Sequence, residues 1–170
     1  MSLLTLTSCT SVPLTSMIKM ASLDDDDITV INASEVRVRL SLTEPAELET
    51  KDVKLVLKFE HLGDTKTEYE YLLEVIDSNK VDAAESWFTS GSVKHQYKFK
   101  FSRLSQLEFN KFQKAYLKQG KPKRYNWTVY YHLKQLPYQG EDLTIDMELK
   151  FSAQEDFFYL LKNRQISIDK

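Results

Sequence analysis

The chain has 170 residues, a formal net charge of −2 and a hydrophobic content of 42%. This length predicts one domain. Nine Tyr, nine Phe and two Trp, beside only four Gly and four Pro, exclude a low-complexity or disordered chain. Because the sequence holds one cysteine, an internal disulfide is excluded. It has no run of about 18 apolar residues, so no transmembrane helix is expected within it.

The stretch Leu6-Thr7-Ser8-Cys9 places an apolar residue and two small residues directly before the only cysteine. It resembles the lipobox of bacterial lipoproteins, in which the cysteine takes the lipid and becomes the first residue of the mature protein. The resemblance implies a truncated signal-peptide remnant at 1–8, a lipid anchor and tether at 9–30, and a single domain at 31–170. A signal peptide needs a basic n-region and a longer apolar run, so we expect the true start to lie upstream.

The same resemblance implies a location. Bacterial lipoproteins carry two or three acyl chains on the cysteine, and each buried CH₂ contributes about 0.8 kcal/mol to membrane attachment. In such proteins an Asp after the cysteine marks inner-membrane retention, whereas this chain has Thr10. We therefore expect the periplasmic face of the outer membrane. If Cys9 carries no lipid, a start at Met17 or Met20 predicts a soluble cytosolic protein.

An acidic run, Asp24 to Asp27, follows the expected tether. Carboxylate oxygens are ligands for Ca²⁺. However, the spaced Asx residues, turn glycine and closing Glu of an EF-hand are absent. Consecutive like charges are typical of a solvated loop, which is the favoured interpretation. No metal and no cofactor is predicted.

Alternation of apolar and polar residues with period two indicates strands with one buried face. The alternating runs cover 35–42, 53–60, 66–76, 93–101, 126–134 and 143–151, and a last short strand is expected around 166–168. Residues 61–65 predict a hairpin between the second and third runs. That hairpin brings Lys54 and Lys58 across from Glu68, Glu70 or Glu74.

Two capping boxes predict helices. Ser105-Gln106-Leu107-Glu108 starts an amphipathic helix over 106–118, whose aromatic stripe is expected in the core, and Gly120 and Pro122 end it. Ser152-Ala153-Gln154-Glu155 starts a short helix that contains Phe157, Phe158, Leu160 and Leu161. A further short helix, capped by Ser78 or Asn79, is expected to run through Glu85.

These elements predict a mainly β fold: an antiparallel β-sandwich of about six to eight strands with two short helical insertions. The alternative is an α+β fold, with one antiparallel sheet and both helices on one face. Residues 1–90 carry a charge of −9 and residues 91–170 a charge of +7. Pairing of acidic with basic strands is favoured as the reason. The alternative is a two-signed surface that orients a partner.

Two loops hold candidate partner contacts. Trp87 and Phe88 are aromatic residues of the kind that anchor interfaces, although closure of the core is favoured for them. Lys121, Lys123 and Arg124 lie beside aromatic residues in a basic linker. Basic residues next to aromatics bind nucleic acid in other proteins. Because the patch is short and the pI is about 6.0, no nucleic-acid partner is predicted. A solvated loop is favoured, with contact to anionic headgroups as the alternative.

Catalytic motifs are absent from the sequence. The histidines are His61, His95 and His132, and no two of them have zinc-ligand spacing. His95 falls on the apolar side of its strand and is expected to be a satisfied core histidine, whereas His132 falls on the outward side. Asp146 and Glu148 share one strand face, where ion pairing is favoured over an acid–base role. We therefore expect no enzyme.

The function predicted from the sequence is a non-catalytic, lipid-anchored binding or scaffold protein of the bacterial cell envelope. Its partners would be the membrane, through the lipid on Cys9, and an envelope protein. One alternative is a carrier of an apolar small molecule, with aromatic residues lining a pocket. The other is the soluble cytosolic protein described above.

Overall fold

The computed structural model describes residues 25–60, 66–82, 93–119, 124–135 and 143–166. Within these ranges most residues belong to strands. The elements, in chain order, are α2 (Asp25–Val30), β1 (Arg37–Thr43), β2 (Glu47–Glu60), β3 (Lys66–Asp82), β4 (Val93–Phe101), α3 (Arg103–Gln119), β5 (Arg124–Gln135), β6 (Leu143–Lys150) and β7 (Phe158–Ile166). The predicted mainly β class with short helices is confirmed.

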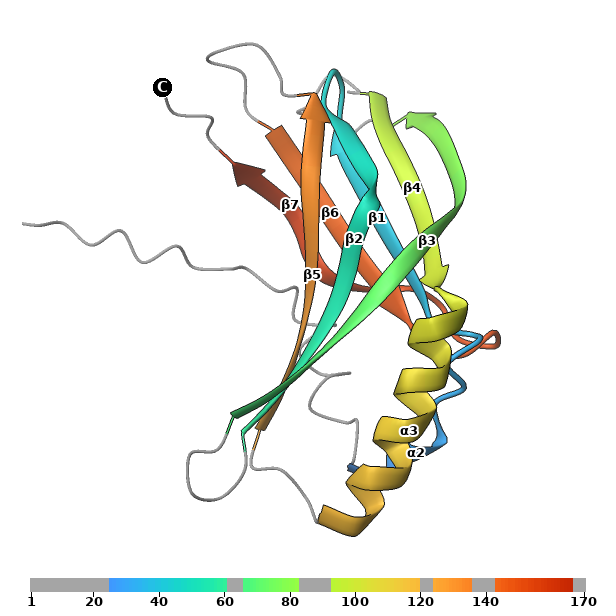
Figure 1. Ribbon diagram of the computed structural model, residues 1–170. Coiled ribbons are helices and arrows are strands. Elements are labelled where there is room, and N and C mark those ends of the chain that lie inside the picture. Colours follow the sequence, from blue (N-terminus) through green and yellow to red (C-terminus); the bar gives the residue numbers. More distant parts are fainter. Residues whose placement is uncertain (1–24, 61–65, 83–92, 120–123, 136–142, 167–170) are drawn as a thin grey trace, which may run out of the picture.

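The strands form one seven-stranded sheet in the order β5-β2-β3-β4-β1-β6-β7. Every neighbouring pair is antiparallel. The sheet curls strongly, so that its β5 side comes round toward its β7 side (Figure 1). The expected sandwich is therefore built from one curled sheet, and its connectivity matches the single-sheet alternative.

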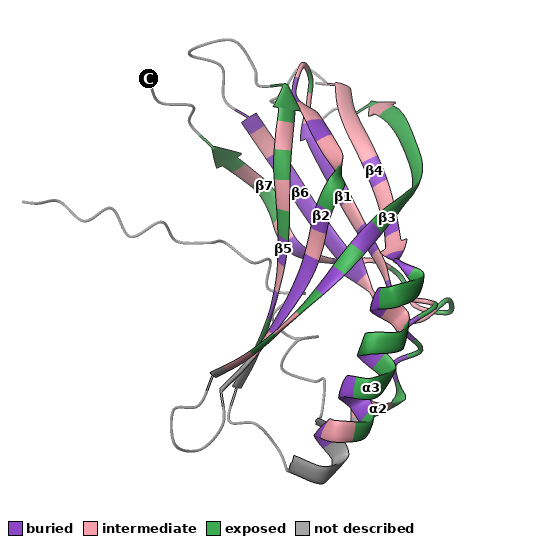
Figure 2. Ribbon diagram, viewed as in Figure 1, coloured by how far each residue is buried: buried purple, intermediate pink, exposed green. Residues whose placement is uncertain are grey.

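The core lies inside the curl, where α3 covers one end of the sheet (Figures 1 and 2). Along each strand, alternate residues are apolar and point to this inner face. The strands could therefore be predicted from the alternating pattern. Phe109 of α3 packs against the two strands that flank β2. Its ring centroid lies 5.4 Å from that of Tyr71 on β3 and 6.3 Å from that of Trp127 on β5. Aromatic rings thus occupy the space beneath the helix.

Helix α3 begins one turn earlier than its capping box predicts. Ser102 is the cap, since its Oγ accepts from the Ser105 N–H at 3.1 Å and its carbonyl accepts from the Gln106 N–H at 2.9 Å. The aromatic stripe of Phe109, Phe112 and Tyr116 is buried as expected.

The acidic run does not form a loop over the described residues, because Asp25–Asp27 lie in helix α2. Ile28 of α2 is fully buried. The Gln113 side chain on α3 donates to the carbonyls of Ile28 and Ile31, at 2.7 and 2.8 Å. The packed domain therefore includes α2 and extends N-terminal to residue 31.

The helix predicted from the second capping box is wrong. The Glu155 N–H reaches the Ser152 carbonyl at 3.4 Å in a turn, and β7 then begins at Phe158. Phe158 pairs with Leu149 of β6, which turns Phe158 inward. Phe158 and Leu160 are buried in strand geometry, so sheet pairing and burial overrode a helical local pattern.

Strand β3 corrects another helix prediction. It continues to Asp82, so residues 78–82 are extended, while residues 83–85 of that predicted helix lie outside the described residues. A bulge between Val75 and Asp77 shifts the register. An extra residue in one strand reverses the facing of all later residues. Ser78 therefore lies opposite Tyr97, on the inner side.

Cross-strand ion pairs occur both within residues 1–90 and between that half and the basic half of the chain. In the β2–β3 hairpin, Lys54 Nζ lies 3.0 Å from Glu70 and Lys58 Nζ lies 2.9 Å from Glu68. Between acidic β3 and basic β4, Lys98 Nζ lies 3.4 Å from an Asp77 carboxylate oxygen. Opposite charges face each other across paired strands, as favoured from the sequence.

Candidate functional site: a charged hollow on the outer face

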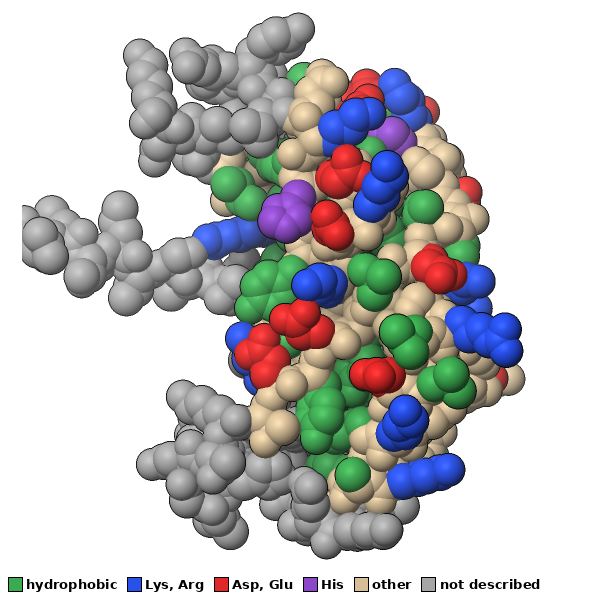
Figure 3. Space-filling model, in the orientation of Figure 1, with side chains coloured by type: hydrophobic (Ala, Val, Ile, Leu, Met, Phe, Trp, Pro, Cys, Tyr) green, Lys and Arg blue, Asp and Glu red, His purple; other side chains and the backbone are tan. Residues whose placement is uncertain are grey.

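An open hollow of about 500 Å³ lies on the outer face of the sheet. Its lining side chains come from the three strands β2, β3 and β5, and they are Asp52, Lys54, Glu68, Glu70, Tyr130 and His132. Figure 3 shows this side of the molecule, where acidic, basic and apolar side chains are interspersed over the strands. We call these six residues the outer hollow.

Strand register brings these residues together from distant parts of the chain. Lys54 lies opposite Leu72 of β3 on one side and opposite Tyr130 of β5 on the other. Residues opposite one another in antiparallel strands share a face, so these side chains all point outward. An irregularity between Glu49 and Lys54 interrupts the β2–β5 pairing. Asp52 lies within this irregularity.

Two exposed ion pairs cross the outer hollow. The carboxylate of Glu70 hydrogen bonds to Lys54 and raises the pKa of its ammonium group. Glu68 raises the pKa of Lys58 in the same way, and Lys58 Nζ also donates to the Tyr130 hydroxyl at 3.3 Å. Together with Lys58, which pairs with Glu68, the lining residues place three carboxylates against two ammonium groups, which leaves an excess of one carboxylate. The hollow is therefore net acidic and favours a cationic group.

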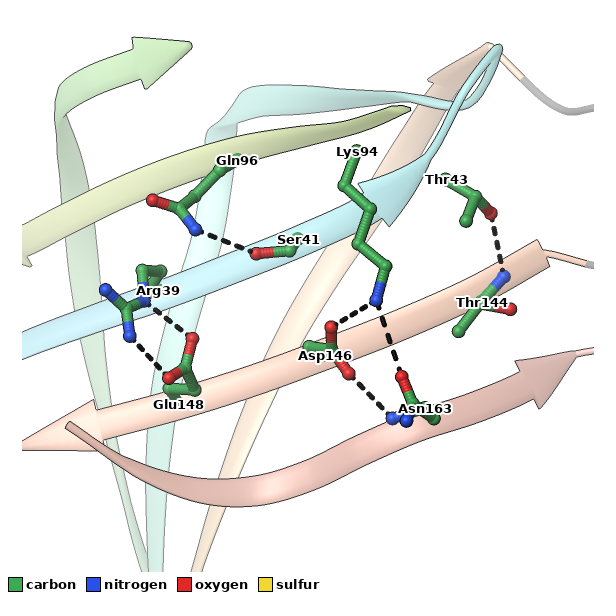
Figure 4. A network of polar contacts seen from close by, with 9 residues as sticks. All are labelled: Arg39, Ser41, Thr43, Lys94, Gln96, Thr144, Asp146, Glu148 and Asn163. Carbon is green, nitrogen blue, oxygen red and sulfur yellow. Dashed lines mark hydrogen bonds and ion pairs between the residues drawn. The ribbon is translucent and has the colours of Figure 1, made fainter. Parts of the chain in front are cut away.

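The other half of the outer face carries ion pairs of a different kind (Figure 4). Arg39 of β1 forms a two-pronged contact with Glu148 of β6, with Nε to Oε2 at 2.6 Å and Nη2 to Oε1 at 2.5 Å. Glu148 raises the pKa of Arg39 through this hydrogen bond. The guanidinium also lies 4.1 Å from the centre of the Phe157 ring, so it is held by stacking as well.

A second buried pair lies along the same strands. Lys94 Nζ of β4 lies 2.5 Å from Asp146 Oδ2, and the other carboxylate oxygen of Asp146 accepts the Asn163 N–H at 2.6 Å. Asn163 has φ of 50°, in the left-handed region that Asn tolerates. Asp146 and Glu148 are thus each engaged by a cation, as their predicted ion pairing requires. Their arrangement ties β1, β4, β6 and β7 together.

A polar cluster on the inner face joins Ser78, His95 and Tyr97. Ser78 Oγ lies 3.0 Å from His95 Nε2, and the Tyr97 hydroxyl lies 2.9 Å from His95 Nδ1. The Leu48 N–H donates to the Tyr97 hydroxyl at 3.2 Å, and burial raises the pKa of this tyrosine. Both ring nitrogens of His95 have partners, as expected, but the residue is half-buried and does not belong to the core.

The residues predicted as sites fall mainly outside the described part of the chain. This applies to Cys9, Trp87, Phe88, Lys121 and Lys123. Arg124 is the first residue of β5, where it pairs with Glu60. His132 is exposed, as its outward position predicted.

The described ranges contain neither a metal-ligand cluster nor a helical membrane span. In this part of the chain, His, Cys, Asp and Glu side chains form no group of three that is able to hold a metal ion. Across the same ranges, no helix combines the length and apolar character required to cross a bilayer.

The outer hollow was missed in the sequence because it belongs to no motif. Its members come from three strands and meet only when the register of both strand pairs is known. The alternating pattern did place Lys54, Glu68, Glu70 and His132 on outward faces. Ser78 gave no such signal, because the bulge reverses its facing.

Comparisons with known proteins found no match. No protein-family model matches the chain, and neither the curated proteins nor the solved structures gave a match.

Proposed function

We propose that this protein is a non-catalytic binding protein of the bacterial cell envelope, anchored by a lipid on Cys9. Its outer hollow binds a basic segment of a partner protein. The observation that carries the proposal is the outer hollow itself, an open acidic depression built on paired strands. Sites on strands are held more rigidly than sites on loops, which reduces the entropy lost on binding.

The chemistry of the hollow favours a lysine or arginine side chain of the partner. Asp52, Glu68 and Glu70 supply carboxylates for charge-assisted hydrogen bonds. Tyr130 is 46% exposed and offers a ring face, over which Lys58 Nζ already lies at 5.7 Å from the centroid. Leu72, exposed beside Lys54, adds apolar contact area. These features match the mixture of aromatic and polar groups found in protein interfaces.

Binding at the outer face, rather than a carrier function, fits the packing of the interior. The rings of Tyr71, Phe101 and Phe109 contact one another at centroid distances of 5.2 to 5.6 Å. These side chains fill the space beneath α3, where aromatic residues lining a carrier pocket would have left a cavity. The outer hollow opens to solvent instead, on the opposite face of the sheet.

A site-specific cross-linking experiment tests the binding proposal. A photoreactive phenylalanine replaces Tyr130 in the full-length chain, expressed in the cells that make the protein. The matched control places the same group at Tyr159, an aromatic residue on the other half of the outer face. We expect a discrete protein adduct from position 130 and none from position 159. Equal adducts from both positions, or none from position 130, contradict the proposal.

Charge variants separate a basic partner from any other partner. Glu68→Gln with Glu70→Gln removes two carboxylates, and we expect several-fold less adduct from position 130. Lys54→Gln with Lys58→Gln removes the competing cations, and we expect as much adduct or more. A decrease in both double variants would show that charge sign is irrelevant, and the partner would then not be basic.

The anchor requires a separate test, because it depends on residues 6–9 rather than on the outer hollow. Wild-type protein and the Cys9→Ala variant, both expressed from the native gene, are fractionated into membrane and soluble material. We expect the wild type with the membranes and the variant in the soluble fraction. Equal distribution of the two proteins would end the lipoprotein interpretation and favour the soluble alternative.

A further inference from the structure

The outward side of helix α3 combines exposed leucines with exposed cations. Leu104 is 68% exposed and Leu107 is 54% exposed, although both are large apolar residues. Arg103, Lys111 and Lys114 are exposed as well. Over α3, Figure 3 shows apolar and basic side chains close to one another. We call these five residues the α3 outer face.

The five residues share one side of the helix. At 3.6 residues per turn, they fall within an arc of about 100°. In projection along the helix axis, cations flank Leu107 on both sides, Lys114 on one and Lys111 on the other. The buried aromatic residues of α3 lie outside this arc, and so does Gln113, against which the acidic helix α2 packs. The α3 outer face is therefore a single strip that faces away from both the core and α2.

The cations of this strip differ from many of those on the sheet, which have carboxylate partners. On the strands, Lys54, Lys58 and Lys98 each lie 2.9 to 3.4 Å from a carboxylate oxygen. None of the three cations of the α3 outer face forms an ion pair with another described residue. Glu108 is the only acidic residue of α3. Three cations against one carboxylate leave an excess of two positive charges, which attracts an anionic surface.

The start of α3 departs from the residue choice that stabilises a helix. Arg103 is the first residue of α3, and the first turn contains no acidic residue. The helix dipole makes a cation unfavourable at this end. Leu104, in the same turn, is exposed to water rather than packed. Residues that break a local rule without a structural gain are typical of functional surfaces.

We propose that the α3 outer face binds the surface of an anionic lipid bilayer, with α3 lying parallel to the membrane. Its cations contact the anionic headgroups, and Leu104 and Leu107 enter the boundary between the headgroups and the acyl chains. Added salt weakens this attraction, because the cations are exposed and their charges are screened. The contact is additional to the lipid on Cys9 and separate from the outer hollow.

The chemistry of the strip favours a lipid surface over an acidic protein. Trp, Tyr and Arg dominate the binding energy of protein interfaces, whereas Leu is under-represented there and Lys is depleted. The aromatic residues of α3, Phe109, Phe112 and Tyr116, are all buried in the core. Helices that lie on membranes combine Lys and Arg with apolar residues such as Leu. The α3 outer face has this composition.

Vesicle sedimentation tests the proposal with the full-length Cys9→Ser protein, which has no cysteine for the lipid. The vesicles are pure phosphatidylcholine, or equal parts of phosphatidylcholine and phosphatidylglycerol. We expect several-fold more protein on the anionic vesicles at low salt, and its release at high salt. Equal binding to the two kinds of vesicle, or binding to neither, overturns the proposal.

Two charge-matched variants in the same background locate the contact. Lys111→Gln with Lys114→Gln removes two cations from the α3 outer face, and we expect several-fold less protein on the anionic vesicles. The control, Lys54→Gln with Lys58→Gln, removes two cations from the sheet, and we expect unchanged binding. Urea midpoints of both double variants verify that the fold is intact. An equal decrease in the two would show that net charge alone drives binding, which overturns the proposal.

The leucines have a readout of their own. Leu107→Cys in the Cys9→Ser background carries an environment-sensitive fluorophore, and Glu70→Cys in the outer hollow is the control. We expect anionic vesicles to shift the emission to the blue at position 107 and not at position 70. Unchanged emission at position 107 overturns the proposal.

A photoreactive group at position 107 distinguishes a lipid surface from a protein in cells. Lipid adducts are expected, and a discrete protein adduct would identify a protein occupant and overturn the proposal. None of these readouts depends on the partner of the outer hollow or on the lipid on Cys9.

Discussion

The two halves of the outer face use the same residue types for different purposes. In the β2–β3–β5 half, the side chains of Lys54 and Glu70 are 42% and 54% exposed. In the β1–β4–β6 half, the side chains of Arg39 and Glu148 are 25% and 6% exposed. Both are cross-strand ion pairs. Burial decides what each pair does, since exposed pairs add little stability and buried charges depend on their partners.

In the buried half, aromatic rings and a backbone N–H complement the ion pairs. Phe157 covers the guanidinium of Arg39, and Tyr159 of β7 lies opposite Glu148 of β6. Carboxylates in that half are fully occupied by cations and a backbone N–H. In the outer hollow, Glu68 and Glu70 remain accessible to solvent. The buried half therefore maintains the fold, and the exposed half is the one in which we propose binding.

The largest expected effect comes from breaking the ion pair that contains the more buried carboxylate, Glu148 of β6. Arg39→Ala leaves the Glu148 carboxylate buried without a cation, so we expect a loss of about 3–5 kcal/mol in the free energy of unfolding. Denaturation in urea measures this loss. The double variant Arg39→Met with Glu148→Leu removes both charges, and we expect it to regain most of the stability. A small effect of Arg39→Ala alone would erase the distinction between the two halves.

An intermediate effect is expected at Asp146. Asp146→Asn keeps an oxygen for the Asn163 N–H but removes the charge that faces Lys94, so a loss of about 1.5–3 kcal/mol is expected. The same urea titration measures it, with thermal unfolding as a second readout. A variant as stable as the wild type would mean that Lys94 finds equivalent solvation without this carboxylate.

The core beneath both halves contains a tyrosine, Tyr71, that should lower the stability of the fold at alkaline pH. Burial, with smaller contributions from Tyr69 and Glu108, raises the pKa of Tyr71. The folded state therefore keeps the Tyr71 proton to a higher pH than the unfolded state. Its contribution is constant below the ordinary tyrosine pKa of about 10 and falls above it, by up to about 1.4 kcal/mol per pH unit.

Tyr71→Phe isolates this contribution. Within the described residues the Tyr71 hydroxyl has no hydrogen-bond partner, so the variant should be about as stable as the wild type near neutral pH. One pH unit above the ordinary tyrosine pKa, we expect the variant to be the more stable protein. Unfolding free energies at both pH values measure the difference, and identical pH profiles would contradict the assignment.

The smallest effect is expected in the outer hollow. Glu70→Gln breaks the exposed pair with Lys54, and we expect no resolvable shift of the urea midpoint, because water solvates both groups. High salt should not change the difference between the urea midpoints of the wild type and the Glu70→Gln variant, because an exposed pair contributes little at any salt concentration. A destabilisation as large as that of Arg39→Ala would make the hollow a structural feature rather than a binding surface.

Much of the fold could be predicted from the sequence, because the alternation of apolar and polar residues indicates which strand face is buried. The run at 93–101 coincides with β4, and the helix expected at 106–118 lies within α3. The hairpin pairing of Lys58 with Glu68 also follows from alternation plus a short turn. These elements depend on local pattern and on neighbours in the chain.

Features that depend on residues far apart in the chain could not be predicted from the sequence. The local pattern at the start of β7 predicts a helix. In the structure, pairing with β6 makes this segment a strand and places Phe158 and Leu160 inside the curl. Alternation shows that a face is buried but not which strands share a sheet, so one curled sheet and two stacked sheets look alike. The contact of Ser78 with His95 depends on a bulge in β3 that no sequence pattern indicates. The outer hollow forms only when the registers of the β2–β3 and β2–β5 pairs are known.

The most direct test of the central claim combines stability and binding in one comparison. Adduct yield from a photoreactive group at position 130 is measured in Glu68→Gln with Glu70→Gln, and in Arg39→Met with Glu148→Leu. Urea midpoints are recorded for the same proteins. We predict that the first double variant loses the adduct and keeps its midpoint, and that the second keeps the adduct. Loss of the adduct only in the second double variant would contradict the division of the outer face.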